Sequence, residues 1–422
     1  MFSQCLSASV VYHIYGVNDM GIKIKCDVLV IGAGVSGIAA AVAAARSGMR
    51  TALAEKDSFP GGIGYSGLLQ HICGLYLNSR AVPEETLNDG IAREVANRLH
   101  QLSPRNKVKK IGQVYVLPYA RDDLSSIFNS MCRAEDKLSV MLDTTAVSVK
   151  KKGDKIIGVR LDRSGTAYKI TPGVVIDCSG DGNAAFMAGA DYQLSPLSER
   201  QLPGFIIHLK GLNTRDETLP VKVPYYLSKA VEAKLFPSYI RFTAFSYAEA
   251  PDEGFLKINP GHEHSRSSRV VLKRAEKMLR YLAEKLPSFR GAYIAGTSLR
   301  VMDREGRRVC GEYTLTEDDI LKGGKFDDGI VKNSWPIELW DTKKGTVYKY
   351  LKPGEYYEVP FRCLKVKGIS NLLCAGRCIS VTHEALGSTR VMGTCMSLGE
   401  QAGLAAAYYI KNGRYPEGIQ DI

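Results

Sequence analysis

The stretch CDVLVIGAGVSGIAAAVAAARSGMRTALAEKDSFPGG, residues 26–62, decides the fold. Its β-branched run at 27–31 leads into closely spaced glycines, and an alanine-rich segment follows that ends at Gly48. This order predicts a strand, a tight turn and a helix with a glycine stop. A second short apolar run at 50–54 predicts the next strand. The opening is therefore expected to form one βαβ unit of a parallel sheet.

The turn between the first strand and the helix matches the G-x-G-x-x-G pattern of dinucleotide-binding folds. We expect Gly32 to make the turn, Gly34 to leave room for a pyrophosphate, and Gly37 to let the helix approach the strand. Glu55 ends the next strand, and an acidic residue there binds the hydroxyls of the adenosine ribose. The N-terminus of the helix offers N–H groups to the phosphates. The segment thus predicts dinucleotide binding.

The sequence after Glu55 favours FAD over NAD. Gly61 and Gly62 form a second stretch of bare backbone, suited to lie beside a longer cofactor. The later strand–glycine segments contain no second complete G-x-G-x-x-G. One extended dinucleotide that contacts several loops accounts for this pattern better than two short ones.

The remaining chain predicts an α/β protein with an inserted domain. DDLSSIFNSMCRAED is typical of an Asp-capped helix, and LSVML, AVSVK, IIGVRL, TAYKI and GVVID predict a meander of short strands. More Pro, Tyr and Lys follow, without a repeat. We expect a Rossmann-like FAD-binding domain, with a parallel sheet and a β-meander, and an inserted α+β substrate domain. The expected boundaries are an N-terminal extension (1–25), a first segment of the FAD-binding domain (26–190), the inserted cap (191–359) and a second segment of the FAD-binding domain (360–422).

Several segments together resemble one family. DVLVIGAGVSGIAAAVAAARSG with LAEKDSFPGG, then VVIDCSGDGNAAFMAGADY, and then NLLCAGRCISVTHEALGSTRVMGTCMSLGEQAGLAAA are similar to three signatures of the FAD-dependent oxidoreductases of glutathione-reductase-like fold. This family is near the fumarate reductase and succinate dehydrogenase flavoproteins. PSFRGAY and REGRRVCGEYTLTEDDIL resemble its Arg-Glu-Ser/Thr-Arg-Arg and Gly-x-Tyr pattern, with Gly306 where the family has a hydroxyl residue.

The resemblance implies how FAD is held. The segment 145–147 would run beside the adenine, and the final helix would begin at about 388–391, directed at the pyrimidine edge of the flavin. A helix N-terminus there stabilises the negative charge of the reduced ring. From motif and resemblance together, the expected cofactor-binding residues are Gly32, Gly34, Val35, Ser36, Gly37, Glu55, Lys56, Gly61, Gly62, Ala146, Val147, Ser179, Gly180, Asp181, Gly376, Arg377, Ser388, Thr389 and Val391.

Five residues are candidates for the chemistry. By resemblance, Arg390 would hold a substrate carboxylate with its planar guanidinium, although the same group also suits a local carboxylate or a flavin phosphate. His383 titrates near neutral pH and is a candidate proton donor or flavin contact, against a role as an ordinary loop histidine. Arg304, Arg307 and Tyr313 would meet the flavin from the inserted domain, or else belong to an Arg–Glu network that stabilises the fold.

The formal net charge of +12 leaves open a nucleic acid, an anionic membrane surface or an acidic substrate as partner. Basic residues concentrate in SRSSRVVLKRAEKMLRYLAEKLPSFR, which predicts a helix with one apolar face and a solvated basic face. Only Tyr281 and Phe289 interrupt these charges, too few for a base-stacking surface.

We expect hydride transfer between FAD and a small anionic organic substrate. A flavin monooxygenase, an electron-transfer subunit and a tRNA-linked flavoprotein remain the alternatives.

Ten cysteines in 422 residues include no two-residue-spaced pair, so the pattern predicts neither a metal site nor a disulfide scaffold. Free thiols favour a reducing, cytoplasmic location. The first residues lack a basic n-region and a sustained apolar run, so we expect no signal peptide and no membrane span. Residues 1–19 are interpreted as an extension or a start-codon artefact, because Met20 would be a more natural start. The sequence leaves the substrate, any redox partner and the oligomeric state open.

Overall fold

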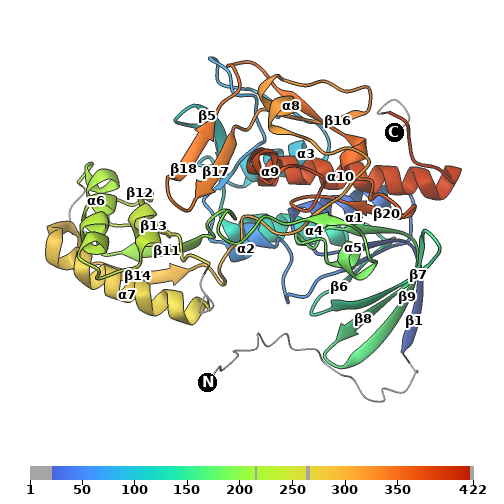
Figure 1. Ribbon diagram of the computed structural model, residues 1–422, viewed down its shortest axis with the longest axis horizontal. Coiled ribbons are helices and arrows are strands. Elements are labelled where there is room, and N and C mark those ends of the chain that lie inside the picture. The colour runs from blue at the N-terminus through green and yellow to red at the C-terminus, as the bar shows by residue number, and fades with distance from the viewer. Residues whose placement is uncertain (1–20, 214–215, 263–266, 419–422) are drawn as a thin grey trace, which may run out of the picture.

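The computed structural model describes residues 21–213, 216–262 and 267–418, so the expected extension at 1–19 lies outside the described residues (Figure 1). The predicted βαβ unit is confirmed as β1 (Ile22–Ile31), α1 (Val35–Arg46) and β2 (Thr51–Ala54). β1 begins five residues before the predicted strand, because its first half pairs in parallel with β9 (Thr166–Asp177) from Ile22 onward.

The central sheet joins a parallel half and an antiparallel half through β9. β6 (Leu138–Met141), β2, β1 and β9 are parallel neighbours in this order, and β20 (Leu372–Cys374) extends the parallel half beyond β9. β7 (Thr145–Lys152) and β8 (Lys155–Arg163) form the meander with the first half of β9. The expected α/β class with a Rossmann-like parallel sheet and a β-meander is confirmed.

Two details of the predicted meander are wrong. LSVML belongs to the parallel half as β6, where Thr51 pairs with Leu138. TAYKI and GVVID form one strand, because β9 has β8 beside its first half and β20 beside its second half, so the segment at Pro172 and Gly173 stays extended. The predicted Asp cap is also absent from α4 (Arg121–Arg133), which starts from Ala120 and carries its aspartates in the first turn.

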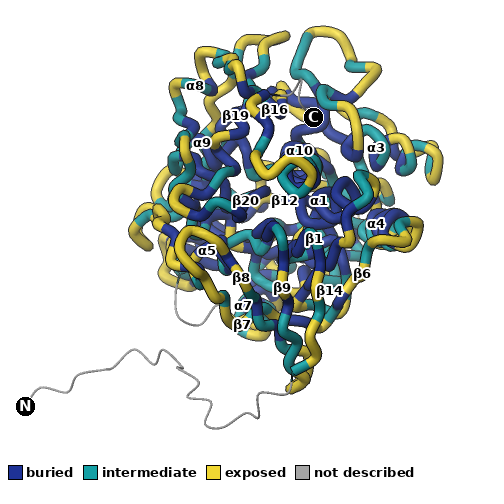
Figure 2. The backbone as a smooth tube through the Cα atoms, turned by 90° about the vertical axis from the view of Figure 1, so that its right-hand side faces the viewer, coloured by how far each residue is buried: buried dark blue, intermediate teal, exposed yellow. Residues whose placement is uncertain are grey.

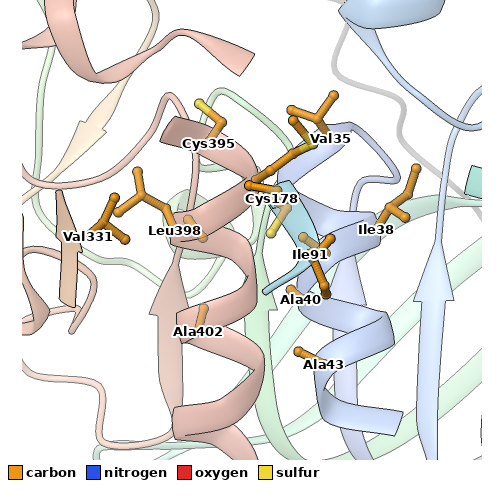
Figure 3. Close-up of a cluster of buried hydrophobic side chains, with 14 of the residues drawn as sticks. Val35, Ile38, Ala40, Ala43, Ile91, Cys178, Val331, Cys395, Leu398 and Ala402 are labelled. Atoms are coloured by element: carbon orange, nitrogen blue, oxygen red, sulfur yellow. The ribbon is translucent and has the colours of Figure 1, made fainter. Parts of the chain in front are cut away.

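Helix α1 and the long helix α10 (Met392–Asn412) pack side by side on the sheet (Figure 3). The contact depends on small residues, because a Cβ atom at Gly399 would lie 2.0 Å from the Ser36 carbonyl oxygen and one at Gly403 would lie 2.3 Å from that of Ala40. Almost all of α1 is buried (Figure 2). α3 (Ile91–Leu102) and α4 cover the neighbouring surface, and Glu400 of α10 accepts a hydrogen bond from the Ile91 backbone N–H at 2.9 Å.

A second hydrophobic core forms under a separate antiparallel sheet, at the left of Figure 1. Its strand order is β12 (Ala244–Tyr247), β13 (Gly254–Ile258), β11 (Phe205–Lys210) and β14 (Tyr293–Thr297). The helices α6 (Leu219–Glu232) and α7 (Ser268–Lys285) pack against it. α7 is the predicted basic helix, and its apolar side buries Val271, Met278 and Leu282.

The chain from Leu315 to Val359 returns to the first core, although it falls within the predicted cap. It carries α8 (Glu317–Leu321), β16 (Gly329–Asn333), β17 (Ile337–Asp341), β18 (Gly345–Lys349) and β19 (Tyr357–Pro360). Trp340 of β17 is an exception, because its side chain belongs to the second core. β17 thus joins the two cores, while the domain boundaries stay a prediction.

The remaining elements are short: α2 (Ile63–Ser66), β3 (His71–Ile72), β4 (Lys109–Ile111), β5 (Val114–Pro118), α5 (Asn183–Met187), β10 (Tyr192–Gln193), β15 (Arg308–Val309) and α9 (His383–Thr389), with 3-10 turns at Ser238–Phe242, Pro287–Phe289 and Phe361–Cys363. Among the described residues, no helix is both long and apolar enough to cross a membrane.

Candidate functional site

A cavity of about 340 Å³ lies where β1, β2, β9 and β20 end in their loops. In open parallel sheets, ligands bind at this edge, outside the carboxyl ends of the strands. Predicted residues that line the cavity are Gly32, Gly34, Val35, Ser36, Glu55, Lys56, Gly62, Thr145, Ala146, Ser179, Gly180, Asp181, Gly376, Arg377, Arg304 and Arg390. The three glycine loops therefore converge on one space, as the sequence predicted.

The first glycine loop has the geometry of a phosphate-binding turn. A Cβ atom at Gly37 would lie 1.7 Å from the Gly32 carbonyl oxygen, so only glycine allows this approach of helix and strand. A Cβ atom at Gly34 would meet nothing within 4 Å, so this side of the backbone is open, and Gly34 lines the cavity. The N-terminus of α1 follows directly, where free N–H groups favour an anion.

Glu55 is buried and fixes the shape of the first loop. Its carboxylate accepts hydrogen bonds from the backbone N–H groups of Ala33, at 2.5 Å, and Asp57, at 2.9 Å. Burial raises the pKa of Glu55 despite these two bonds. The contact between Glu55 and the ribose hydroxyls stays a prediction. The Glu55 carboxylate has further lone pairs that can accept hydrogen bonds from these hydroxyls.

The second and third glycine loops are joined by an ion pair. Arg377 Nη2 lies 2.7 Å from Asp181 Oδ1. The other terminal nitrogen of Arg377, Nη1, is buried and has no hydrogen-bond partner. A buried guanidinium N–H without an acceptor is costly, and a phosphate oxygen would satisfy it. This nitrogen and the open space at Gly34 show that the cavity residues fit a dinucleotide diphosphate.

The sequence interpretation missed several lining residues. Arg300 pairs with Asp57 through two hydrogen bonds, at 2.9 and 2.7 Å, and so connects the inserted segment to the loop after β2. No local pattern marks this long-range pair. The other lining residues without a prediction are Ile31, Ala54, Ile63, Thr144, Cys178, Asn183, Val301, Met302, Asp303, Ala375, Met392 and Cys395.

Six predicted cofactor residues, Gly37, Gly61, Val147, Ser388, Thr389 and Val391, are outside the lining. Gly37 and Gly61 instead support the loop, since Gly61 N–H donates to the Ala33 carbonyl at 2.8 Å. Val147 is 44% exposed on the meander. Ser388 is buried in α9, where its hydroxyl donates to the Trp335 carbonyl at 2.6 Å.

The N-terminus of the long helix lies slightly later than predicted. α9 occupies residues 383–389, and α10 begins at Met392, with Val391 as its cap residue. Met392 and Cys395 of α10 line the cavity. The Gly393 N–H donates to the Cys73 carbonyl at 2.9 Å, so one donor of this helix terminus is already bonded.

Two of the five chemical candidates, Arg304 and Arg390, line the cavity. Arg390 Nη2 donates to the Glu338 carbonyl at 3.0 Å and to Gln201 Oε1 at 3.2 Å, while its Nε is buried without a partner. Arg304 donates to the Leu202 carbonyl and stacks on the Trp340 ring, 3.9 Å from the ring centroid. Burial lowers the pKa of both arginines, that of Arg304 to about 9.

His383 lies in a buried ion network instead of the cavity lining. Its Nδ1 is 3.0 Å from Glu305 Oε2, and Arg308 Nη1 is 2.5 Å from Glu305 Oε1. The bond to Glu305 raises the pKa of His383. Burial opposes ionisation of Glu305, but His383 and Ser195 donate to it and lower its pKa to about 2. This arrangement favours the structural alternative for His383.

Arg307 and Tyr313 also lie outside the cavity lining. Arg307 donates to the Asp181 carbonyl at 2.9 Å and to Asn183 Oδ1 at 2.6 Å, so it supports the second glycine loop. Tyr313 donates to Asp319 at 3.0 Å. Both contacts are of the fold-stabilising kind.

The family pattern has a hydroxyl residue where this chain has Gly306, and the structure gives a steric reason for the glycine. A Cβ atom at this position would lie 1.8 Å from Asp181 Oδ1 and 3.0 Å from Arg377 Nη1. The Asp181–Arg377 pair therefore occupies the space that a hydroxyl side chain would need.

Two solved structures with a TM-score of 0.50 share the overall fold of this chain. OxyS anhydrotetracycline hydroxylase from Streptomyces rimosus matches with a TM-score of 0.50 and 11% identity, over 92% of this chain and 63% of that one. The aromatic hydroxylase CabE from angucycline biosynthesis matches with a TM-score of 0.50 and 12% sequence identity, over 94% of this chain and 64% of CabE. A geranylgeranyl bacteriochlorophyll reductase-like protein from Thermoplasma acidophilum has a TM-score of 0.49 and 12% sequence identity to this chain. The match covers 94% of this chain and 81% of that protein. This chain thus spans less than two thirds of either hydroxylase.

Comparison by sequence is decisive at the level of the family. Among curated proteins, none matches the sequence significantly. The model of the FAD dependent oxidoreductase family matches residues 27–421, which include all three glycine loops and the whole cavity. The chain therefore belongs to the FAD-dependent oxidoreductase family, and FAD is its cofactor.

Proposed function

We propose that this oxidoreductase transfers a hydride between FAD and a small anionic organic substrate that binds against Arg390 and Arg304. FAD, when bound, supplies the hydride acceptor or donor. The glycine loops and Arg377 would hold its diphosphate, and Glu55 its ribose. The two arginines then bind and orient the substrate.

One observation carries this proposal: the cavity has cationic side chains beyond those of the glycine loops. Arg390 lines it with a buried Nε that has no partner, and Arg304 lies beside it. A planar guanidinium binds two carboxylate oxygens at once and so fixes the orientation of the substrate. Correct orientation of the reacting carbon is the main contribution that a protein makes to hydride transfer.

The test is an anaerobic screen of flavin absorbance against carboxylates, amines, alcohols and NAD(P)H. We expect a carboxylate-bearing compound to reduce the flavin, or to reoxidise the reduced flavin. With that compound, Arg390→Gln should raise KM about 100-fold, and Arg390→Lys should recover only a fraction of the loss, because lysine lacks the bidentate fork. Turnover of uncharged compounds alone would contradict the proposal.

A second candidate function is oxygen-dependent hydroxylation. OxyS and CabE, which are similar to this chain in fold, are both named as hydroxylases. In this case, NAD(P)H would reduce the flavin, and one oxygen atom would appear in the product. Oxygen consumption that is stoichiometric with a hydroxylated product would establish it over the first proposal.

A further inference from the structure

A second group of charged side chains meets Arg304 and Arg390 at the junction of the two cores. Lys257 comes from β13 of the second core, and Glu338 and Trp340 come from β17. The Lys257 Nζ lies 4.1 Å from the centroid of the Trp340 ring, which Arg304 also contacts at 3.9 Å. Trp340 Nε1 donates to Glu338 Oε1 at 2.8 Å. We call Lys257, Arg304, Arg390, Glu338 and Trp340 the junction cluster.

The junction cluster has more positive than negative charge. Its three cations share one carboxylate, that of Glu338, as a common electrostatic partner. Among the described residues, none of the three cations forms an ion pair, and Lys257 makes no side-chain hydrogen bond. Burial of unpaired charge is costly unless a counter-ion is supplied.

The titration of these groups reflects the same imbalance. Burial, Arg304 and Arg390 together lower the pKa of Lys257 to about 8, against the opposing effect of Glu338. Burial opposes ionisation of Glu338, but the three cations lower its pKa. The neighbouring Cys73 stays neutral, because burial raises its pKa to about 12. As the pH rises, Lys257, with a pKa of about 8, thus loses its charge before Arg304, with a pKa of about 9.

We propose that the junction cluster is an anion subsite that takes a carboxylate group of the substrate, with Lys257 as the residue that couples binding to protonation. This rests on the proposed function and specifies its substrate class as carboxylates. Arg304 and Arg390 line the cavity, whereas Lys257, Glu338 and Trp340 lie behind this lining, so a substrate carboxylate beside the flavin would contact the two arginines directly. The bound carboxylate supplies the missing negative charge, and the buried Trp340 ring positions Lys257 and Arg304, which both contact it.

The sign of the pH effect follows directly. Below pH 8, Lys257 is protonated and the subsite attracts an anion; above pH 8, Lys257 loses its charge and affinity falls. One proton is involved between about pH 8 and about pH 9, where Arg304 also begins to lose its charge, so the dissociation constant should rise by up to about tenfold across this unit. Carboxylate binding at higher pH should also be accompanied by proton uptake.

The experiment uses the holoenzyme and three carboxylates, acetate, succinate and benzoate, with their amides as neutral controls. Dissociation constants are taken from perturbation of the flavin spectrum between about pH 6.5 and about pH 9, below the titration of Arg304, and proton uptake from calorimetry in two buffers. For the carboxylate that binds most tightly, we expect Lys257→Met to weaken binding about 10- to 100-fold at pH 7 and to abolish the pH dependence. Lys257→Arg should keep the affinity and remove the fall above pH 8.

Lys210→Met is the matched control, because Lys210 lies on the same sheet but pairs with Glu253 at 2.9 Å. It should behave like the unmodified enzyme. An unchanged affinity and pH profile in Lys257→Met would overturn the subsite while leaving the proposed function intact. Loss of FAD from Lys257→Met would also overturn it, since the cluster would then serve the cofactor. Failure of every compound to change the flavin redox state in the anaerobic screen would instead refute the proposed function.

Discussion

The cofactor end and the substrate end of the cavity are built in different ways. At the cofactor end, backbone groups dominate, and each glycine loop directly follows a strand of the central sheet. At the other end, the junction cluster consists of side chains from β13, β17 and two loops. A backbone site is encoded in contiguous sequence, whereas a side-chain site depends on tertiary contacts. The two ends should therefore respond differently to substitution.

The largest expected effect is on the fold at the cofactor end. Gly37→Val places a side chain 1.7 Å from the Gly32 carbonyl oxygen, so α1 must move away from β1. We expect a loss of about 4 kcal/mol or more in the free energy of unfolding. Urea unfolding of the protein without FAD measures this, and near-normal stability would show that α1 tolerates the displacement.

Gly34→Val should weaken FAD binding without changing the stability of the fold. Its Cβ atom would meet no protein atom within 4 Å, and the side chain points into the open space next to the loop. Stability without FAD should stay within about 0.5 kcal/mol. FAD affinity should fall about 100-fold, equivalent to about 2.7 kcal/mol. Fluorescence titration with FAD gives the affinity, and retention of tight binding would place the diphosphate elsewhere.

At the substrate end, Glu338→Gln tests the electrostatic interaction between Glu338 and Lys257. It removes the carboxylate that supports the charge on Lys257, so the pKa of Lys257 should fall below 8. The pH at which carboxylate affinity starts to decrease should drop by about one unit, equivalent to about 1.4 kcal/mol. The amide oxygen still accepts from Trp340, which preserves the geometry. An unchanged pH profile in the spectral titration would mean that Glu338 and Lys257 do not interact.

The smallest expected effect is at His383. Its bond to Glu305 raises the pKa of His383 above 6.5, so the pair stabilises the fold fully below pH 6.5 and less as the pH rises through the raised value. His383→Gln should therefore cost about 1 kcal/mol at pH 6 and less at pH 8.5. Urea unfolding at both pH values tests this. Normal stability combined with lost activity would assign His383 to the chemistry instead.

The sequence predicted the cofactor end in detail because its signals are local. Gly32, Gly34 and Gly37 stand in one turn whose flanking strand and helix have clear periodicity. It did not predict the continuity of β9, since Pro172 and Gly173 normally interrupt a strand. Pairing partners on both sides override that local preference.

The errors near the long helix have a different origin. Thr382 caps α9 by accepting from the Ala385 N–H, and Gly387 packs against the backbone of Glu338. This inserted turn moves the lining residues to Met392 and Cys395. Lys257 carried no signal at all, because a lysine in a short strand is ordinary until tertiary structure places it beside two arginines.

The most direct test of the central claim is a stopped-flow comparison of one substrate carboxylate with its own amide in the unmodified holoenzyme at pH 7. The two compounds have nearly the same shape and differ in charge. If the substrate binds through its carboxylate to Arg390 and Arg304, with Lys257 behind them, kcat/KM for the change in flavin absorbance should be at least about 100-fold higher for the acid. Equal values for acid and amide would contradict the account.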